Sequence, residues 1–397
     1  MGRLIVVGAM LVVGLLSASC DNQPSSSGHE IGGSQTPSPM DQPSSDIASD
    51  DLVLRMFIWD GYAPEQHVRK FEKHVEATYG RKLRLEIELT EGGDTDFFDP
   101  IRNKAVDVVT LTHHLFKDER FGYVGKKMLL PLDLENIPNF DHLIPSLQSA
   151  DFHTDGGEIY GVPICQGPYG LAYNLDLVPT APTSWNILWD PAYQGTYIVA
   201  ANEFMYNINI TALAMGYPRA SISSYDALNN DPFKLKLRQL AVNAHSFWVG
   251  ADKPDDLSGR SLGAIWGDSI GGLLRRGERW ALAVPVEGTP YWIDNYAITW
   301  ALADDPFRKK LAEEWINMLL ELDYQVDYIV REITLVPVVD DIEDVLTPAE
   351  AERLYASALE SSYEQRIPQT MVSSRDRNGL QKLWREAMEG ITVVNPD

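Results

Sequence analysis

The sequence predicts an α/β protein built on a parallel sheet, in a chain of 397 residues that is long enough for two domains. The dense apolar run at 52–59, "LVLRMFIW", is typical of a strand buried on both faces. A helical pattern follows at 64–80, and strand-like runs come next at 81–89 and 106–111. Strand, helix and strand in this order indicate a parallel sheet.

The helix at 64–80 has clear start and stop signals. Pro64 suits the first turn, and Val68, Phe71 and Val75 lie on one face. Gly80 is placed to end the helix.

The remaining elements follow the same rules. "YGVPICQGPYGLAYN", "GTYIVAA" and "LGAIW" are strand-like, and helices are expected at 305–322, 347–359 and 378–390. Thr347 and Glu350 form a capping box with Pro348 in the first turn, and Gly390 closes the last helix.

Residues 1–20 have the layout of a secretory signal, with Arg3 followed by an apolar run from Leu4 to Leu16. The small residues before Cys20 resemble the bacterial lipobox, in which the cysteine becomes acylated, although Ser17 stands where leucine is usual. An uncleaved membrane anchor is the alternative. Either way, we expect export.

Residues 21–51 are rich in Ser, Pro, Gly and Asp, which predicts a disordered tether. A lipid on Cys20 would tie the folded body to a membrane. Cys165 is then the only remaining cysteine, so no intramolecular disulfide is possible. Its apolar surroundings indicate an inert buried thiol.

The chain is strongly acidic, with 57 Asp and Glu against 33 Lys and Arg and a net charge of -24. Nucleic acid needs concentrated positive charge, so we expect no nucleic-acid partner. The balance permits a cationic ligand.

Indole rings and carboxylates alternate in the stretch "AIWGDSIGGLLRRGERWALAVPVEGTPYWIDNYAI". Of its tryptophans Trp266, Trp280 and Trp292, the first and last have an aspartate two positions on, Asp268 and Asp294. An organic cation packs its methylenes on ring faces, and its ammonium is drawn to the ring and the carboxylate. The alternative is that these tryptophans belong to the core.

Three further segments place polar or aromatic side chains where strands end. They are Trp59, Asp60 and Tyr62 in a loop, Thr112 and His114, and Asn202 with Glu203 at a helix start. Ligands in open α/β sheets bind at the carboxyl ends of strands, so these segments can converge on one crevice. The alternative is a structural role for each.

No enzyme signature stands out. The chain has no G-x-S-x-G elbow, no P-loop and no H-E-x-x-H motif, and no carboxylate pair is singled out as in a glycosidase. His113 and His114 are adjacent and would face opposite sides of a strand, which is unsuited to sharing a metal. We predict no catalytic residues, no metal and no cofactor.

Four motifs in order resemble those of the bacterial extracellular solute-binding proteins of ABC importers, in the spermidine/putrescine-binding group. They are "IWDGYAPEQHVRKFEK", "TSWNILWDPAYQGTYIV", "LGAIWGDS" and "VPVEGTPYWIDNYAI", and the resemblance covers about 52–390.

The resemblance implies a two-lobed periplasmic-binding-protein fold, with an interlobe ligand cleft and crossing hinge segments. Lobe 1 would comprise 52–161 and 292–340, and lobe 2 would comprise 162–291 and 341–397. The lobes would close on the ligand by a hinge motion.

The resemblance also implies ligand contacts at particular positions. Trp59, Tyr62, Trp266 and Trp292 match an aromatic box, Asp294 an amine-binding carboxylate, Thr112 a hydroxyl position, His114 a frequent tyrosine, and Gln369 a C-terminal contact.

This chain departs from the group where a second amine is held by two acids. Asn202 falls at the first acid and Met205 near the second, with Glu203 between them. Leu335 replaces an expected tyrosine, and Asp268 is an additional acid. One ammonium site is therefore expected to be kept and the other altered.

Together these observations predict a monomeric substrate-binding lipoprotein of an ABC importer, which captures a polyamine or related organic cation. Its partners would be that cation, a permease in the inner membrane and the lipid anchor. A ligand sensor for a membrane signalling protein would use the same cleft, and an exported hydrolase is the enzyme alternative.

Overall fold

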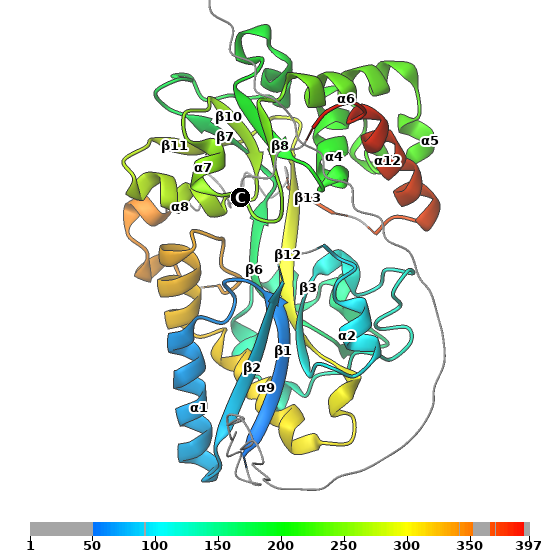
Figure 1. Cartoon of the computed structure of the whole chain (residues 1–397). Coiled ribbons are helices and arrows are strands. Elements are labelled where there is room, and N and C mark those ends of the chain that lie inside the picture. The colour runs from blue at the N-terminus through cyan, green and yellow to red at the C-terminus, as the bar shows by residue number, and fades with distance from the viewer. Residues whose placement is uncertain (1–50, 91–92, 341, 352–365, 370, 393–397) are drawn as a thin grey trace, which may run out of the picture. The chain divides into compact units, whose positions relative to one another are not determined.

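The computed structural model describes residues 51–90, 93–340, 342–351, 366–369 and 371–392 (Figure 1). The predicted signal, its lipidated Cys20 and the tether up to residue 50 lie outside this range. Within it, no helix combines the length and the apolar character needed to cross a bilayer.

The first sheet has the strand order β13-β12-β3-β1-β2, with β6 pairing with β12. Its strands are β1 (Leu52–Trp59), β2 (Leu83–Thr90), β3 (Val108–Thr112), β6 (Val162–Pro168), β12 (Thr289–Ile298) and β13 (Arg366–Pro368). Strand β1 runs parallel to β2 and to β3, as predicted. The antiparallel partners of β12 are β3 and β6.

Helices α1 (Glu65–Tyr79) and α9 (Pro306–Met318) share a hydrophobic core with this sheet. Two short helices, α2 (Phe98–Arg102) and α3 (Pro145–Gln148), lie in the chain between strands of the same sheet. The ring of Phe71 in α1 contacts the ring of Trp315 in α9, with centroids 5.5 Å apart. Gly80 ends α1 in the left-handed conformation, as predicted, since its φ is 65°.

The predicted helix at 305–322 is wrong at its end, because α9 stops at Met318. A π-helix then runs from Asp323 to Glu332 and is followed by Thr334, whose φ is 61°. Apolar spacing does not reveal this change of winding, since the buried positions continue through both segments.

The second sheet has the order β11-β7-β10-β8-β9. Its strands are β7 (Gly170–Asn174), β8 (Tyr197–Ala200), β9 (Ser246–Trp248), β10 (Leu262–Ile265) and β11 (Trp280–Ala283). Its helices are α4 (Phe204–Ala214), α5 (Tyr225–Leu228), α6 (Asp231–Asn243), α7 (Pro254–Leu257), α8 (Asp268–Arg275) and α12 (Ser374–Ala387). The last helix begins at Ser374, four residues before the predicted start at Asn378. Ser373 is its N-cap, since the Ser373 side chain accepts a hydrogen bond from the backbone N–H of Asp376.

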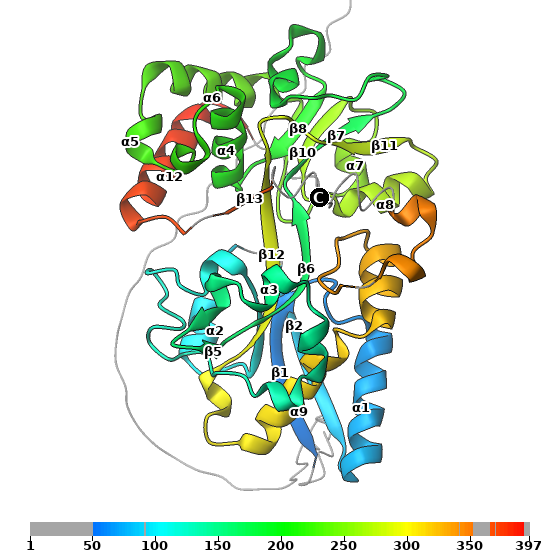
Figure 2. The ribbon, with the colours of Figure 1, turned by 180° about the vertical axis from the view of Figure 1, so that it is seen from behind.

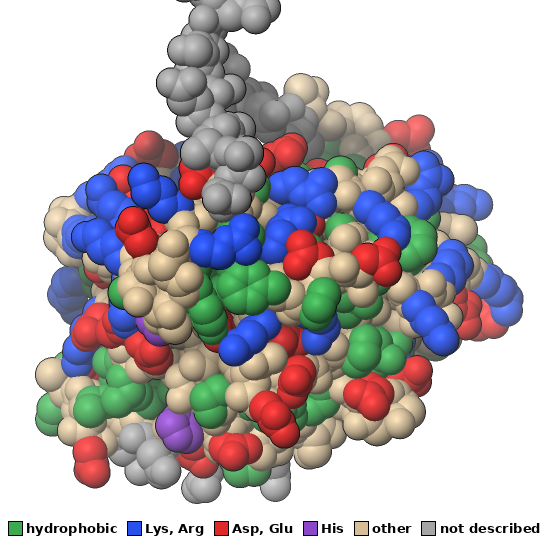
Figure 3. Space-filling view, turned by 90° about the horizontal axis from the view of Figure 1, so that it is seen from below, with side chains coloured by type: hydrophobic (Ala, Val, Ile, Leu, Met, Phe, Trp, Pro, Cys, Tyr) green, Lys and Arg blue, Asp and Glu red, His purple; other side chains and the backbone are tan. Residues whose placement is uncertain are grey.

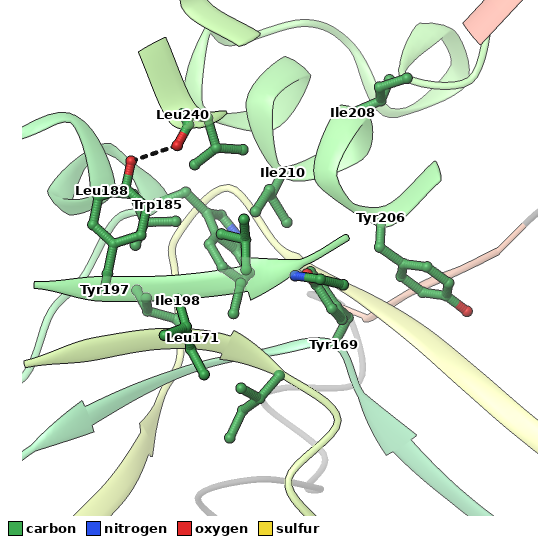
Figure 4. Close-up of a cluster of buried hydrophobic side chains, with 14 of the residues drawn as sticks. Tyr169, Leu171, Trp185, Leu188, Tyr197, Ile198, Tyr206, Ile208, Ile210 and Leu240 are labelled. Carbon is green, nitrogen blue, oxygen red and sulfur yellow. Dashed lines mark hydrogen bonds between the residues drawn. The ribbon is translucent and has the colours of Figure 1, made fainter. Parts of the chain in front are cut away.

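Figure 4 shows the core between the second sheet and its helices. Trp185 and Tyr197 are completely buried there, and the Tyr197 hydroxyl donates a 2.7 Å hydrogen bond to the carbonyl of Leu240. Tyr206 lies at the edge of the cluster, and its ring points away from the other labelled side chains.

Strands β6 and β12 extend from the first sheet toward the second (Figures 1 and 2). In β12, residues 289–291 pair with β13, residues 294–298 pair with β3, and residues 291–296 pair with β6. A further crossing segment lies beside β6, where Gln166 and Val336 exchange two hydrogen bonds of 3.0 and 3.1 Å. The predicted lobe 2 includes β6 and β13, whereas both strands pair with β12 in the first sheet. The lobe bounds stay a prediction.

A short hairpin and a helix cap are two further local features. A hairpin joins β4 (Thr154–Asp155) to β5 (Glu158–Ile159). The capping box is confirmed, since Thr347 N–H donates to Glu350 (2.7 Å) and Glu350 N–H donates to Thr347 Oγ1 (3.3 Å). The rest of the helix predicted at 347–359 lies outside the described range.

The face of the molecule shown in Figure 3 carries both blue Lys and Arg side chains and red Asp and Glu side chains, with apolar side chains scattered among them. No single kind covers that face.

Candidate ligand-binding site

The center of the candidate site is the carboxylate of Asp294 in β12. The hydroxyls of Tyr62 and Thr112 each donate a 2.6 Å hydrogen bond to it, one to each oxygen. Thr112 lies directly opposite Asp294 in the antiparallel pair of β3 and β12, and Tyr62 follows the end of β1. The neighbouring ends of β1 and β3 therefore bring together three residues predicted from sequence.

Asp294 is buried without a cationic partner among the described residues: its hydrogen-bond donors are the two neutral hydroxyls. Burial raises the pKa of this carboxyl above its usual range, although the hydrogen bonds from Thr112 and Tyr62 and the charge of His114 act to lower it; the charge on Asp94 adds to the rise. A cation placed here would therefore add a direct counter-charge, which the hydrogen-bond donors of the described residues do not supply.

Three tyrosine hydroxyls hold the loop that carries Tyr62. Tyr296 and Tyr324 donate to the carbonyl of Tyr62 at 3.1 and 3.0 Å, and Tyr328 donates to the carbonyl of Gly61. Two of these come from the π-helix, so that segment supports the site directly. Sequence reasoning missed all three, because their partners are backbone atoms far away in the chain.

The two tryptophans next to aspartates meet each other. Trp266 follows β10 of the second sheet, Trp292 lies in β12, and their ring centroids are 6.4 Å apart with planes at 87°. Trp266 also meets Tyr206 and Tyr169 edge-on, at 4.7 and 5.0 Å. Edge-to-face packing of this kind holds each ring in a defined orientation.

Asp252, which sequence reasoning missed, anchors the Trp266 loop. Its buried carboxylate accepts hydrogen bonds from the backbone N–H of Trp266 (2.8 Å), Gly267 (3.3 Å) and Ser269 (3.0 Å), and from the Ser269 hydroxyl (2.5 Å). Asp268 is the first residue of α8, and its side chain lies outside the described part of the chain.

Two further carboxylates, those of Asp94 and Glu203, belong to the electrostatic surroundings of the site. His114 Nε2 is 3.1 Å from a carboxylate oxygen of Asp94, another residue that sequence reasoning missed. Burial, and then the charge on Asp94, raise the pKa of Glu203 to about 7, while His114 and Arg377 oppose that rise. Burial also acts to raise the pKa of Asp94, but the charges of His114, Arg120 and Arg377 bring it below its usual range.

Two predicted residues, Trp59 and Leu335, are placed by packing and backbone contacts. The Trp59 ring packs edge-on against Phe97, with ring centroids 4.8 Å apart, and the backbone N–H of Trp59 donates to Thr110 Oγ1 (2.9 Å). No ring contact joins Trp59 to Trp266 or Trp292 among the described residues. Leu335 is buried in the core of the first sheet.

Three others lie at the surface or act through their backbone. Asp60 and Asn202 are exposed, and the Asp60 carboxylate accepts from the N–H of Gly61. Gln369 contributes its carbonyl to His113 Nε2, 3.0 Å away. Met205 is buried in the second core.

Cys165 is buried, as predicted for an inert thiol. No group of three His, Cys, Asp or Glu side chains within the described ranges is arranged to hold a metal ion.

Two sheets joined by crossing strands, with a carboxylate and facing indoles where the strands end, are the features of a protein that binds a small solute. The chain belongs to the family described as bacterial extracellular solute-binding protein, whose model matches residues 103–356. It is therefore a binding protein and not an enzyme, as predicted, and its family is extracellular.

Curated relatives include the spermidine/putrescine-binding periplasmic proteins of Escherichia coli K12 and Salmonella typhimurium. Each is 25% identical to this chain over 283 residues, which are 70% of this chain and 75% of the relative. The family predicted from four sequence motifs is thus confirmed.

Solved structures confirm the two-lobed periplasmic-binding-protein fold. The spermidine/putrescine substrate-binding protein PotD of Streptococcus pneumoniae, solved with calcium and HEPES, has a TM-score of 0.69 and 16% identity, covering 85% of this chain and 98% of its own. A putative spermidine/putrescine ABC transporter structure from Listeria monocytogenes has a TM-score of 0.68 and 17% identity, covering 85% and 99%. The Atu4243-GABA receptor has a TM-score of 0.62 and 17% identity, covering 87% and 100%.

Proposed function

We propose that this chain captures a polyamine such as putrescine or spermidine, or a related organic cation, as the substrate-binding lipoprotein of an ABC importer. The buried carboxylate of Asp294 carries the proposal, because its described partners are two neutral hydroxyls. A ligand ammonium would supply the missing positive charge, and the Trp266 and Trp292 rings would pack against its methylenes.

The energies favour a cation over a neutral ligand. A cation on an aromatic face gains roughly 0.5–2 kcal/mol, and a hydrogen bond to a charged group contributes about 1.5–3 kcal/mol. Since about 1.4 kcal/mol corresponds to a tenfold change in affinity, one such hydrogen bond contributes one to two decades.

The second amine site that the family resemblance implies is altered in this chain. The Asn202 amide and the Met205 thioether are both uncharged, so neither supplies a counter-charge for an ammonium. Glu203, with Asp94 in its electrostatic neighbourhood, and Asp268 are the remaining candidates for a second ammonium. The proposal therefore includes smaller monoamines as alternative ligands.

The proposal also includes the partners. A lipid on Cys20 would hold the protein at the periplasmic face of the envelope, and a permease in the inner membrane would receive the ligand. The predicted lobes, 52–161 with 292–340 and 162–291 with 341–397, would close around the cation as a monomer.

Calorimetric titration of residues 21–397 tests the ligand. The panel is putrescine, cadaverine, spermidine, spermine, arginine, glycine betaine and γ-aminobutyrate, the last because of the GABA receptor among the structural neighbours. Micromolar binding of a polyamine that is lost in Asp294→Ala supports the proposal. Binding of none of these amines would refute it.

A further inference from the structure

Gly167 in β6 lies directly opposite Trp292 of β12 in the antiparallel pair. A β carbon at position 167 would lie 2.7 Å from Cζ2 of the Trp292 indole, 3.0 Å from Cε2 and 3.3 Å from Nε1. The indole edge thus occupies the place where a side chain on β6 would stand.

The backbone conformation does not account for this glycine. Gly167 is not among the glycines with positive φ, so any residue could adopt its backbone angles. The close approach of the Trp292 ring is what excludes a side chain, as when an aromatic ring covers a glycine on the neighbouring strand.

The other edge of β12 is held by His113. The N–H of Ile293 donates to Nδ1 of His113 (3.2 Å), and Nε2 lies 3.0 Å from the carbonyl oxygen of Gln369. A backbone donor on Nδ1 and a backbone acceptor near Nε2 require a neutral ring that carries its proton on Nε2. Burial, assisted by His114, lowers the pKa of His113 to about 3, which agrees with a neutral ring.

This imidazole fills a gap between two strands. Along the same edge of β12, Tyr291 is paired with Pro368 at the end of β13, and Asp294 is paired with Thr112 at the end of β3. The Ile293 N–H falls between those pairs, and His113 supplies the acceptor that no strand offers there. The backbone on each side of Trp292 is therefore fixed.

We infer that Gly167 and His113 are positioning residues for the Trp292 indole: Gly167 gives the ring its place on β6, and His113 fixes the backbone beside it. The inference rests on the proposed function for the role of Trp292 in ligand binding. The position of the ring can be tested without ligand.

The first test compares Gly167→Ala with Gly170→Ala in the chain of residues 21–397. Gly170 is the matched control, because a β carbon there would meet the flexible Leu282 side chain at 3.0 Å rather than an indole. The indole N–H resonance of Trp292, assigned by its loss in Trp292→Phe, is recorded by NMR without ligand.

We expect Gly167→Ala to shift that resonance and to weaken cation binding about tenfold, a loss of about 1.4 kcal/mol. Gly170→Ala should change neither. An unshifted Trp292 resonance in Gly167→Ala would overturn the inference, even if binding changed.

The second test uses conservative variants of His113. Asn keeps an acceptor near the position of Nδ1 for Ile293, Gln keeps a donor near the position of Nε2 for Gln369, and Leu keeps neither. We expect the Trp292 indole N–H resonance to move less in His113→Asn than in His113→Gln, and to move most in His113→Leu. Equal resonances in Asn and Gln variants would contradict the role of the Ile293 bond, whether or not the Leu variant folds.

The two proposals fail in different ways. If the unaltered chain binds no cation, the proposed function is refuted while the NMR comparison still decides the positioning role. If the chain binds a polyamine and Trp292→Phe weakens that binding, but Gly167→Ala leaves the resonance and the affinity unchanged, the positioning role alone is refuted.

Discussion

The hydroxyl of Tyr62 donates a 2.6 Å hydrogen bond to the buried carboxylate of Asp294, 232 residues further along the chain. The same carboxylate accepts from Thr112, so two neutral groups orient one negative charge. None of the described hydrogen-bond donors to this carboxylate is charged, so a ligand cation would be its direct counter-charge.

Asp294→Asn should weaken polyamine binding about 10- to 100-fold, because a charged hydrogen bond contributes about 1.5–3 kcal/mol. Titration calorimetry measures the affinity. Asp60→Asn is the matched control, since Asp60 is exposed and its carboxylate accepts only a local bond from Gly61. Equal affinities for Asp294→Asn and the unaltered chain would exclude this carboxylate from the site.

Tyr62→Phe should move the pH dependence of binding. The Tyr62 hydroxyl lowers the pKa of Asp294, so its removal raises that pKa further. A cation binds the ionised carboxylate; affinity therefore falls as the pH drops through the pKa of Asp294, and in the variant this fall should begin at a higher pH. Titrations at a series of acidic pH values provide the comparison, and an unmoved profile would show that the bond does not tune this carboxyl.

Glu203→Gln should flatten the binding profile near neutrality. Glu203 has a pKa of about 7, so its ionised fraction rises about tenfold between about pH 6 and about pH 8. If Glu203 holds an ammonium, affinity for a diamine should rise over that interval in the unaltered chain. Asp94, His114 and Arg377 act on the same carboxyl and are retained in the variant. A profile that keeps its slope in Glu203→Gln would assign the titration to another group.

Asp252→Ala should loosen the Trp266 loop. The substitution leaves three backbone N–H groups without their acceptor, and each buried unsatisfied group costs about 1–3 kcal/mol. Urea unfolding should show a lower free energy of unfolding, and calorimetry should show weaker binding. Ser269→Ala removes only the hydroxyl bond and should have a smaller effect on both. A loss of stability without any loss of affinity would separate Asp252 from the site.

The sequence by itself determined much of the fold. The apolar run of β1, the caps of α1 and the order of strand, helix and strand depend on local propensities and periodicity, so they could be recognised before any tertiary contact was known. The same holds for Asp294 with Trp292, because residues two apart on a strand share one face. Motif order was specific enough to indicate the family.

Only the tertiary structure decided how the site is held. Gly167, His113 and Asp252 act on backbone atoms or rings that are far away in the chain, and nothing in their local sequence indicates those partners. A glycine in a strand is ambiguous until its φ and its neighbours are known. The winding of the π-helix, which supplies hydroxyls to the Tyr62 loop, also depends on those packed contacts. Side-chain type and spacing thus determine which groups can bind a cation, whereas long-range packing determines where those groups stand.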